Sequence, residues 1–149
     1  MRWHRSHAPF RLPWQVLAAL ALVALLGACA NSSESRATEH EPKHIQVQAL
    51  AQSLSANACT ALDVNTPAVR TRHGRIPQAR LLSDYRQYSL DELPDDRDRP
   101  LVFYCANERC SASDAAARRA LQAGYRDVSV LRAGIAGWAK AGQQTLPVE

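Results

Sequence analysis

Residues 101–111 read LVFYCANERCS, and they combine a short apolar strand with a loop that holds two cysteines. Leucine, valine, phenylalanine and tyrosine in succession predict a buried strand over residues 101–104, which Pro100 introduces. The alanine-rich residues 111–123, which a glycine follows, predict a helix. Strand, loop and helix in this order are typical of α/β sheets, which bind ligands at the carboxyl ends of their strands. Cys105 occupies that position and is therefore the first candidate for a functional residue.

Shorter apolar segments on both sides of this stretch predict an alternation of strands and helices. The predicted strands are residues 60–64, 79–82 and 128–131, with a further short strand at the start of residues 44–55, and the predicted helices are the rest of residues 44–55, residues 85–93 and residues 134–141. Such alternation predicts an α/β fold of three layers, with a mostly parallel central sheet and helices on both faces.

The N-terminus has the order of an export signal. Three arginines and no acid precede an apolar run over residues 14–26, which is shorter than the roughly 20 apolar residues of a membrane span. The run closes with Leu-Gly-Ala-Cys at residues 26–29, and these four residues resemble the lipobox of bacterial lipoproteins. The resemblance implies that residues 1–28 are a signal peptide and that Cys29 is lipidated. The alternative is a lone apolar cysteine within a signal peptide or signal anchor.

Removal of residues 1–28 leaves 121 residues, enough for one domain of ordinary size. Apart from the lipidated cysteine, residues 29–43 contain only small, polar and charged residues and predict a flexible tether. A single domain is then predicted over residues 44–149. Three of the 18 basic residues leave with the leader, so 15 remain against 14 acidic residues. This balance excludes a basic surface for nucleic acid.

A lipid anchor predicts a protein of the cell envelope that faces the periplasm. Several acyl chains hold a protein firmly at a membrane, because each buried CH₂ contributes about 0.8 kcal/mol. Ala30, rather than aspartate, follows Cys29, and by resemblance to enterobacterial lipoproteins this favours the outer membrane over the inner one.

The loop after Cys105 suits a reactive thiolate. Backbone N–H groups of residues 106–110 are expected to curl around the sulfur, and the start of the next helix adds roughly half a positive charge. Both effects favour thiolate over thiol. Ser111, with Asp114 three residues later, predicts a side-chain cap at this helix start. The alternative is that Cys105 is only the buried last residue of a strand, since free cysteine is among the most buried residue types.

Four motifs in the chain occur in the order found in one known family. They are Thr60-Ala-Leu-Asp-Val-Asn65, His73-Gly-Arg-Ile-Pro-Gln-Ala79, Phe103-Tyr-Cys105 with the loop to Ser111, and Gly124-Tyr-Arg-Asp-Val128 followed by Leu131-Arg-Ala-Gly-Ile-Ala-Gly-Trp138. With these motifs, residues from about 44 to 142 resemble the rhodanese-like sulfurtransferase domain. The resemblance implies the rhodanese-like α/β fold.

The resemblance also implies a reaction in two half-steps at Cys105. The thiolate attacks the outer sulfur of thiosulfate or another small sulfane donor and becomes a persulfide, and a thiol or cyanide acceptor then removes that sulfur. No metal and no cofactor is required, and loop N–H donors would stabilise the developing charge. The residues of the implied substrate-binding loop are Ala106, Asn107, Glu108, Arg109, Cys110 and Ser111.

The chain departs from the family pattern Cys-x-x-Gly-x-Arg-Ser inside this loop. Glu108 stands at the glycine position and Cys110 at the arginine position. The loss of a cation and the gain of a carboxylate make the loop less suited to an anionic donor such as thiosulfate, although Arg109 is a candidate to compensate. Asn65 replaces an arginine and Gln78 replaces a glycine, which we expect to affect only the support of the loop.

Cys110 leaves two further functions open. A thiol five residues from a persulfide or sulfenate can resolve it to a disulfide if the two Cα atoms come within about 7 Å, which would make the protein a thiol-disulfide redox protein that uses Cys105 and Cys110. Equally, Cys110 is a small residue that suits packing at a helix start. Because the loop has lost its arginine and glycine, a non-catalytic module that binds a protein partner is the third alternative.

The remaining candidate residues favour structural roles. Cys59 is most simply a buried, inert thiol, and His73 lies in a glycine-proline corner. Trp138 and Tyr104 are expected in the core. A zinc site is disfavoured because Cys105 and Cys110 lack a second close pair or a nearby histidine. A cysteine phosphatase is excluded because its loop requires arginine six residues after the cysteine, where this chain has serine.

Overall fold

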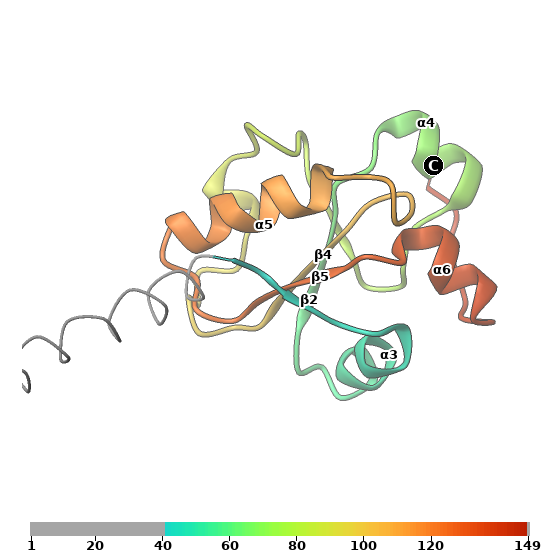
Figure 1. Ribbon diagram of the computed structural model, residues 1–149, viewed down its shortest axis with the longest axis horizontal. Coiled ribbons are helices and arrows are strands. Elements are labelled where there is room, and N and C mark those ends of the chain that lie inside the picture. Colours follow the sequence, from blue (N-terminus) through green and yellow to red (C-terminus); the bar gives the residue numbers. More distant parts are fainter. Residues whose placement is uncertain (1–40, 149) are drawn as a thin grey trace, which may run out of the picture. The chain divides into compact units, whose positions relative to one another are not determined.

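The computed structural model describes residues 41–148, which contain a five-stranded sheet and its helices (Figure 1). The strands are β1 (Lys43–His44), β2 (Thr60–Asp63), β3 (Arg80–Leu81), β4 (Leu101–Tyr104) and β5 (Val128–Leu131). The α-helices are α3 (Val47–Ser55), α4 (Pro67–His73), α5 (Ala112–Gln122) and α6 (Gly134–Lys140), and η1 (Leu90–Glu92) is a 3₁₀ turn.

The sheet has the order β1-β5-β4-β2-β3, and every pair of neighbouring strands is parallel. Strand β4 is central, with Phe103 opposite Leu62 on one side and Val130 on the other. All four of its residues are buried, as expected for an inner strand of a parallel sheet that is covered on both faces. The carboxyl end of β4 therefore lies in the middle of one sheet edge, and Cys105 follows it directly.

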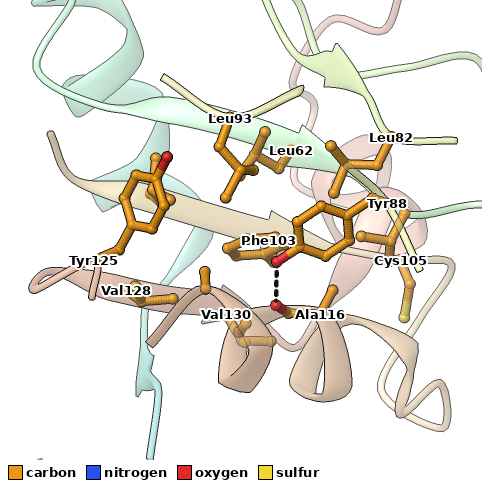
Figure 2. Close-up of a cluster of buried hydrophobic side chains, with 14 residues drawn as sticks. Leu62, Leu82, Tyr88, Leu93, Phe103, Cys105, Ala116, Tyr125, Val128 and Val130 are labelled. Atoms are coloured by element: carbon orange, nitrogen blue, oxygen red, sulfur yellow. Dashed lines mark hydrogen bonds between the residues drawn. The ribbon is translucent and has the colours of Figure 1, made fainter. Parts of the chain in front are cut away.

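Helices cover both faces of the sheet, so the predicted three-layer α/β fold is confirmed. Helix α5 covers one face and α3 and α6 cover the other (Figure 1). On the α5 face, Phe103 packs with Tyr88 and with the alanines of α5, and the Tyr88 hydroxyl donates to the Ala116 carbonyl at 2.8 Å (Figure 2). On the other face, Tyr104 packs with Leu50 and Trp138. Successive residues of β4 thus point into different cores.

The helix predicted over residues 85–93 is wrong, because the segment is divided into two short turns that each have their own side-chain cap. The Asp84 carboxylate caps the first turn by accepting from the N–H groups of Arg86 at 2.6 Å and Gln87 at 2.8 Å. The Ser89 N–H, which a continuous helix would use for an internal bond, donates to the Glu92 carboxylate at 2.8 Å. Ser89 and Glu92 then form a reciprocal capping box around the short turn η1. Such local bonds compete with a continuous helix, and the resulting turns place the Tyr88 ring in the core.

Helix α4, which the sequence analysis did not predict, is held by an ion pair rather than by an apolar face. Its buried residue is Arg70, whose guanidinium donates to the Asp63 carboxylate at 3.3 Å and to the carbonyls of Asp63 and Leu82 at 2.8 Å each. A polar helix of this kind gives no hydrophobic period. The available signal was Pro67 directly after Thr66, since proline is favoured at the first position of a helix.

The described part of the chain begins close to the predicted start of the domain. Lys43 already belongs to β1, where it pairs with Ser129 of β5, so the sheet starts one residue before the predicted boundary at His44. The predicted signal peptide, Cys29 and residues 30–40 of the tether lie outside residues 41–148. Among the helices that the structure describes, none is long and apolar enough to cross a membrane.

Helix α6 packs directly on the loop that follows Cys105. The N–H groups of Ile135 and Ala136 donate to the carbonyls of Cys105 at 2.9 Å and Ala106 at 3.0 Å. Gly134 makes this approach possible, because a Cβ at this position would lie only 2.5 Å from the Cys105 carbonyl oxygen. The residue also has a φ of +60°, which favours glycine.

Gly134→Ala is expected to destabilise the fold more than Gly142→Ala. Both glycines have positive φ, at +60° and +74°, but a Cβ at Gly142 would meet no atom within 4 Å. Gly142→Ala should therefore cost only the backbone strain of about 1–2 kcal/mol, whereas Gly134→Ala should cost a further 1–3 kcal/mol or so for overpacking against the loop. Urea unfolding of the two variants measures the difference in their free energies of unfolding. Equal losses of unfolding free energy would show that the loop does not limit the space at Gly134.

Candidate active site

Cys105 lies at the carboxyl edge of the sheet, under the first turn of α5. Its side chain is buried, with 2% of the residue exposed, and it joins the core on the α5 face (Figure 2). The hydroxyl of Ser113, a buried residue of α5, lies 3.5 Å from Cys105 Sγ. Ser113 was not singled out from the sequence, because only the fold turns its side chain toward the sulfur.

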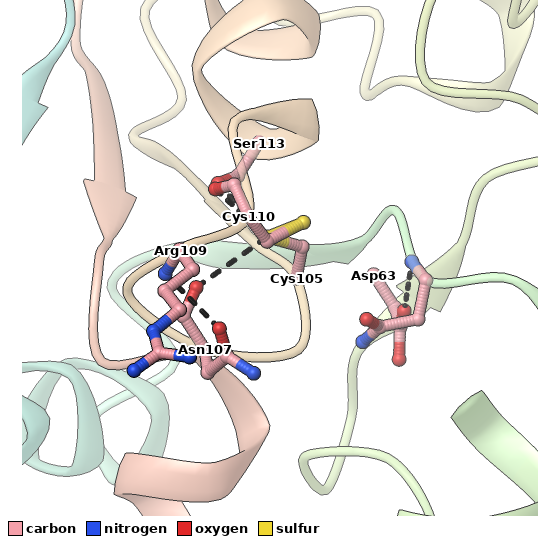
Figure 3. The surroundings of a disulfide bond; sticks show 7 residues. Asp63, Cys105, Asn107, Arg109, Cys110 and Ser113 are labelled. Carbon is pink, nitrogen blue, oxygen red and sulfur yellow. Dashed lines mark hydrogen bonds between the residues drawn. A yellow bond between two sulfur atoms is a disulfide. The ribbon is translucent and has the colours of Figure 1, made fainter.

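Cys105 and Cys110 form a disulfide bond (Figure 3). Their Cα atoms are 6.3 Å apart, which is within the range of disulfide bridges. The two residues differ in accessibility, since Cys110 is half-buried while Cys105 is buried. The disulfide therefore joins a buried cysteine to a more accessible one.

The expected ring of backbone N–H donors around the sulfur is not present in this disulfide-bonded loop. Asn107 binds two of the loop N–H groups instead: its side-chain oxygen accepts from Arg109 N at 3.0 Å and its carbonyl accepts from Cys110 N at 3.0 Å. The Cys110 carbonyl oxygen lies 3.2 Å from Cys105 Sγ. Among the described residues, no backbone N–H donates to this sulfur. Asparagine is frequent in turns because its side chain accepts hydrogen bonds from nearby backbone N–H groups. This property was the sequence signal for the role of Asn107.

The start of α5 lies where the sequence predicts it, but the expected side-chain cap does not form. Ser111 occupies the N-cap position without a side-chain hydrogen bond. Asp114 turns instead to the neighbouring strand, where its carboxylate accepts from the Arg132 guanidinium at 3.0 Å. The same guanidinium donates to His44 Nε2 at 3.0 Å. Arg132, the residue after β5, thus replaces the local cap, because a charge-assisted bond is stronger than a neutral one.

The charged residues of the loop face solvent rather than the sulfur. In Figure 3 the Arg109 side chain points away from the disulfide, and together with Glu108 and Lys140 it lines a cavity of about 310 Å³ beside α6. A second cavity, of about 290 Å³, adjoins Cys110 and is lined in part by Arg118 and Arg132. Arg109 therefore does not occupy the place of the missing loop arginine in this state of the loop.

A buried polar network supports the sheet edge beside the loop. Asp63, at the end of β2, accepts from the Tyr104 hydroxyl at 2.7 Å and from the Asn65 N–H at 2.7 Å. Burial and the adjacent Asp63 carboxylate raise the pKa of Tyr104, which keeps the phenol protonated as a donor. The side-chain nitrogen of Asn65 is buried without a hydrogen-bond partner among the described residues. Replacement of the family arginine by Asn65 thus leaves one polar group unsatisfied.

The other residues that the sequence analysis assigned to structural roles lie in structural positions. Cys59 is a buried free thiol, and burial raises its pKa. His73 is the exposed last residue of α4, and Trp138 is buried, with its indole N–H donating to the Gln144 carbonyl at 2.8 Å. Gln78 has a φ of +64°, which explains the glycine preference of the family at that turn. Residues 41–148 hold no cluster of three or more metal-ligating side chains.

Solved structures resemble this fold at low sequence identity. A rhodanese-related protein from Thermoplasma volcanium has a TM-score of 0.53 and 25% identity over 70% of this chain and 97% of that one. The polysulfide-sulfur transferase homodimer from Wolinella succinogenes has a TM-score of 0.60 and 18% identity over 78% and 87% of the two chains. Thiosulfate sulfurtransferase from Pseudomonas aeruginosa has a TM-score of 0.58 and 23% identity over 76% of this chain and 21% of that one. No curated protein matched.

The family comparison covers almost all of the described elements. A family model for the rhodanese-like domain matches residues 46–141, from the residue before α3 to the residue after α6. This range agrees with the region of resemblance inferred from the four motifs. With its parallel sheet, and with Cys105 at the start of the loop between β4 and α5, the chain belongs to the rhodanese-like domain family.

Proposed function

We propose that this protein is a sulfurtransferase or persulfide carrier that uses Cys105 as the sulfur-bearing residue. The observation that carries the proposal is the position of Cys105 in a rhodanese-like fold, at the carboxyl end of the central strand and at the start of the loop to α5. Two of the similar structures are named as a polysulfide-sulfur transferase and a thiosulfate sulfurtransferase. Ligands of open α/β sheets bind at this edge.

The proposed reaction exchanges one sulfur–sulfur bond for another. The Cys105 thiolate attacks the outer sulfur of a sulfane donor, the S–S bond of the donor breaks, and the donor leaves as a thiol or as sulfite. A Cys105 persulfide remains, from which a thiol or cyanide acceptor takes the outer sulfur. The Ser113 hydroxyl, 3.5 Å from Sγ, is placed to donate a hydrogen bond to the sulfur.

The charges of the loop favour a donor with less negative charge than thiosulfate, such as a thiol persulfide. A dianionic donor requires a cation close to the sulfur, but the family arginine position holds Cys110 and the Arg109 side chain points away. Glu108 adds a carboxylate to the same loop. We therefore propose a small sulfane-sulfur compound as donor and a thiol as the physiological acceptor.

The disulfide favours a second candidate function, that of a thiol-disulfide redox protein. Cys105 and Cys110 are bonded in the structure, and a disulfide in which one cysteine is only half-buried can exchange with external thiols. This function needs both cysteines, whereas sulfur loading needs only Cys105.

Replacement of Cys105 is expected to abolish sulfur loading. Reduced protein treated with inorganic polysulfide should gain one sulfur atom on Cys105, trapped by iodoacetamide and measured by mass spectrometry, and Cys105→Ser should gain none. Cys59→Ser is the matched control, because Cys59 is a buried free thiol with a raised pKa and should not load. Loading of Cys105→Ser to the wild-type level would contradict the proposed role of Cys105.

Restoration of the family loop is expected to raise activity toward thiosulfate. Glu108→Gly with Cys110→Arg removes a carboxylate and adds a cation beside Cys105, which should increase kcat/KM for thiosulfate:cyanide transfer by about tenfold or more, the equivalent of about 1.4 kcal/mol. Glu108→Gln is the control that removes only the charge. A double variant with unchanged thiosulfate activity and an unchanged Tm would show that loop charge does not select the donor.

We further propose that the protein is held in the cell envelope by lipid on Cys29 and faces the periplasm, with the outer membrane as the favoured site. The support is the Leu-Gly-Ala-Cys sequence after an apolar run and basic residues. Cells fed radioactive palmitate should label the wild-type protein and should not label Cys29→Ser. Equal labelling of the two would contradict the anchor, and Cys59→Ser serves as the cysteine control.

A further inference from the structure

We propose that Cys110 resolves the Cys105 persulfide and releases its outer sulfur as hydrosulfide. The protein would then be a sulfide-releasing enzyme that consumes a dithiol reductant, rather than only a carrier that waits for an acceptor. This inference rests on the proposed sulfur loading of Cys105. It joins the two candidate functions into one cycle, in which loading is followed by formation of the observed disulfide.

The folded loop already holds the two sulfurs at bonding distance. The Cα atoms of Cys105 and Cys110 are 6.3 Å apart, and the disulfide is present with both β4 and α5 formed. The side chain and carbonyl of Asn107 hold the intervening turn through Arg109 N and Cys110 N. The disulfide is therefore compatible with an intact sheet and helix.

The disulfide-bonded loop offers no backbone donor for a persulfide anion. The Cys110 carbonyl oxygen lies 3.2 Å from Cys105 Sγ, and Asn107 occupies two loop N–H groups that could otherwise stabilise the negative charge of the outer sulfur. An anion without hydrogen-bond donors has a higher free energy. Departure of the outer sulfur as hydrosulfide removes that charge from the loop.

The resolving step balances without an added reactant. The Cys110 thiolate attacks Cys105 Sγ, the bond between Sγ and the outer sulfur breaks, and the outer sulfur leaves with the electron pair as HS⁻. The proton of the Cys110 thiol ends on the departing sulfur, which therefore leaves as HS⁻ and not as S²⁻. The two cysteines are oxidised to the disulfide, and the sulfane sulfur is reduced to sulfide by the same two electrons.

An external dithiol closes the cycle at the more accessible sulfur. Cys110 is half-buried and adjoins the cavity of about 290 Å³, whereas Cys105 is 2% exposed. One thiolate of the reductant attacks Cys110 Sγ and displaces Cys105 as a thiolate, and its second thiolate then displaces Cys110. The reductant leaves as a disulfide, and both protein cysteines are reduced for the next donor.

The structure favours sulfide release over a relay of sulfur between the two cysteines. In a relay, Cys110 would attack the outer sulfur of the persulfide and become the persulfide itself. In the folded loop, Cys110 Sγ is bonded to the inner sulfur, Cys105 Sγ. Attack on the inner sulfur therefore uses the geometry that exists, and a relay predicts a persulfide on Cys110 that a peptide map can detect.

A single-turnover experiment tests the inference. Fully reduced full-length protein is mixed with thiosulfate or with inorganic polysulfide, without reductant. Released sulfide is measured with monobromobimane against a Cys105→Ser blank in the thiosulfate arm, where loading leaves only sulfite, and the polysulfide arm is read from the peptides alone. After alkylation, trypsin separates the two cysteines, because cleavage at Arg97, Arg109 and Arg118 places Cys105 on residues 98–109 and Cys110 on residues 110–118. The panel is the wild type, Cys59→Ser, Cys110→Ser and Cys110→Ala.

The wild type and Cys59→Ser are expected to release about one sulfide per chain and to end with peptides 98–109 and 110–118 joined by a disulfide. Both Cys110 variants should retain one extra sulfur on peptide 98–109 and release sulfide at least tenfold more slowly. Wild type that keeps its persulfide, Cys110 variants that release sulfide at the wild-type rate, or a persulfide on peptide 110–118 would each overturn the inference while leaving sulfur loading intact. Failure of the folded Cys110 variants to load with either donor would instead refute the proposed sulfur transfer itself, and the inference with it.

Discussion

The central position of β4 in an all-parallel sheet is the constraint on which the rest of the structure depends. Each edge of β4 is paired, with β2 on one side and β5 on the other, and both of its faces are covered. Such a strand must be apolar along its whole length, and it must end where the chain can turn back over the sheet as a helix. Cys105 lies at that turn, so its burial and its place at the ligand-binding edge have the same cause.

The loop beyond Cys105 is held from both ends by backbone hydrogen bonds that carry little sequence information. Ile135 and Ala136, at the start of α6, bind the carbonyls of Cys105 and Ala106, and Asn107 binds two N–H groups further along. These bonds leave a carbonyl, rather than an N–H group, beside the sulfur. The loop therefore suits formation of a sulfur–sulfur bond more than it suits a long-lived anion.

The two departures of the loop from its family pattern act together. Glycine to Glu108 and arginine to Cys110 remove the features that suit an anionic donor, and the second change also supplies a thiol. Two further departures lie outside the loop: among the described residues the Asn65 side-chain nitrogen is buried without a partner, and Gln78 adopts a φ that glycine would adopt more easily. Sulfide release through an internal disulfide accounts for the gain of Cys110 in a way that thiosulfate transfer does not.

The sequence by itself determined the elements whose signals are local. The apolar run of β4, the alanine-rich α5 with its terminal glycine and the strand β5 were predicted within one residue, because propensity and termination signals lie inside each segment. The position of Cys105 followed from the order of these elements. The export signal and Cys29 also rest on local signals, and they remain predictions.

Only the tertiary structure decided the features that depend on distant partners. Helix α4 is held because Arg70 reaches Asp63 and Leu82. The predicted cap of α5 is lost because Asp114 binds Arg132, which directly follows β5. The N–H groups of the loop turn away from the sulfur because the oxygens of Asn107 accept from them; the turn-forming property of asparagine is visible in the sequence, but the N–H groups that it binds are not. The pairing of Cys105 with Cys110 likewise required the folded path of the loop, since spacing alone states only that two sulfurs can meet.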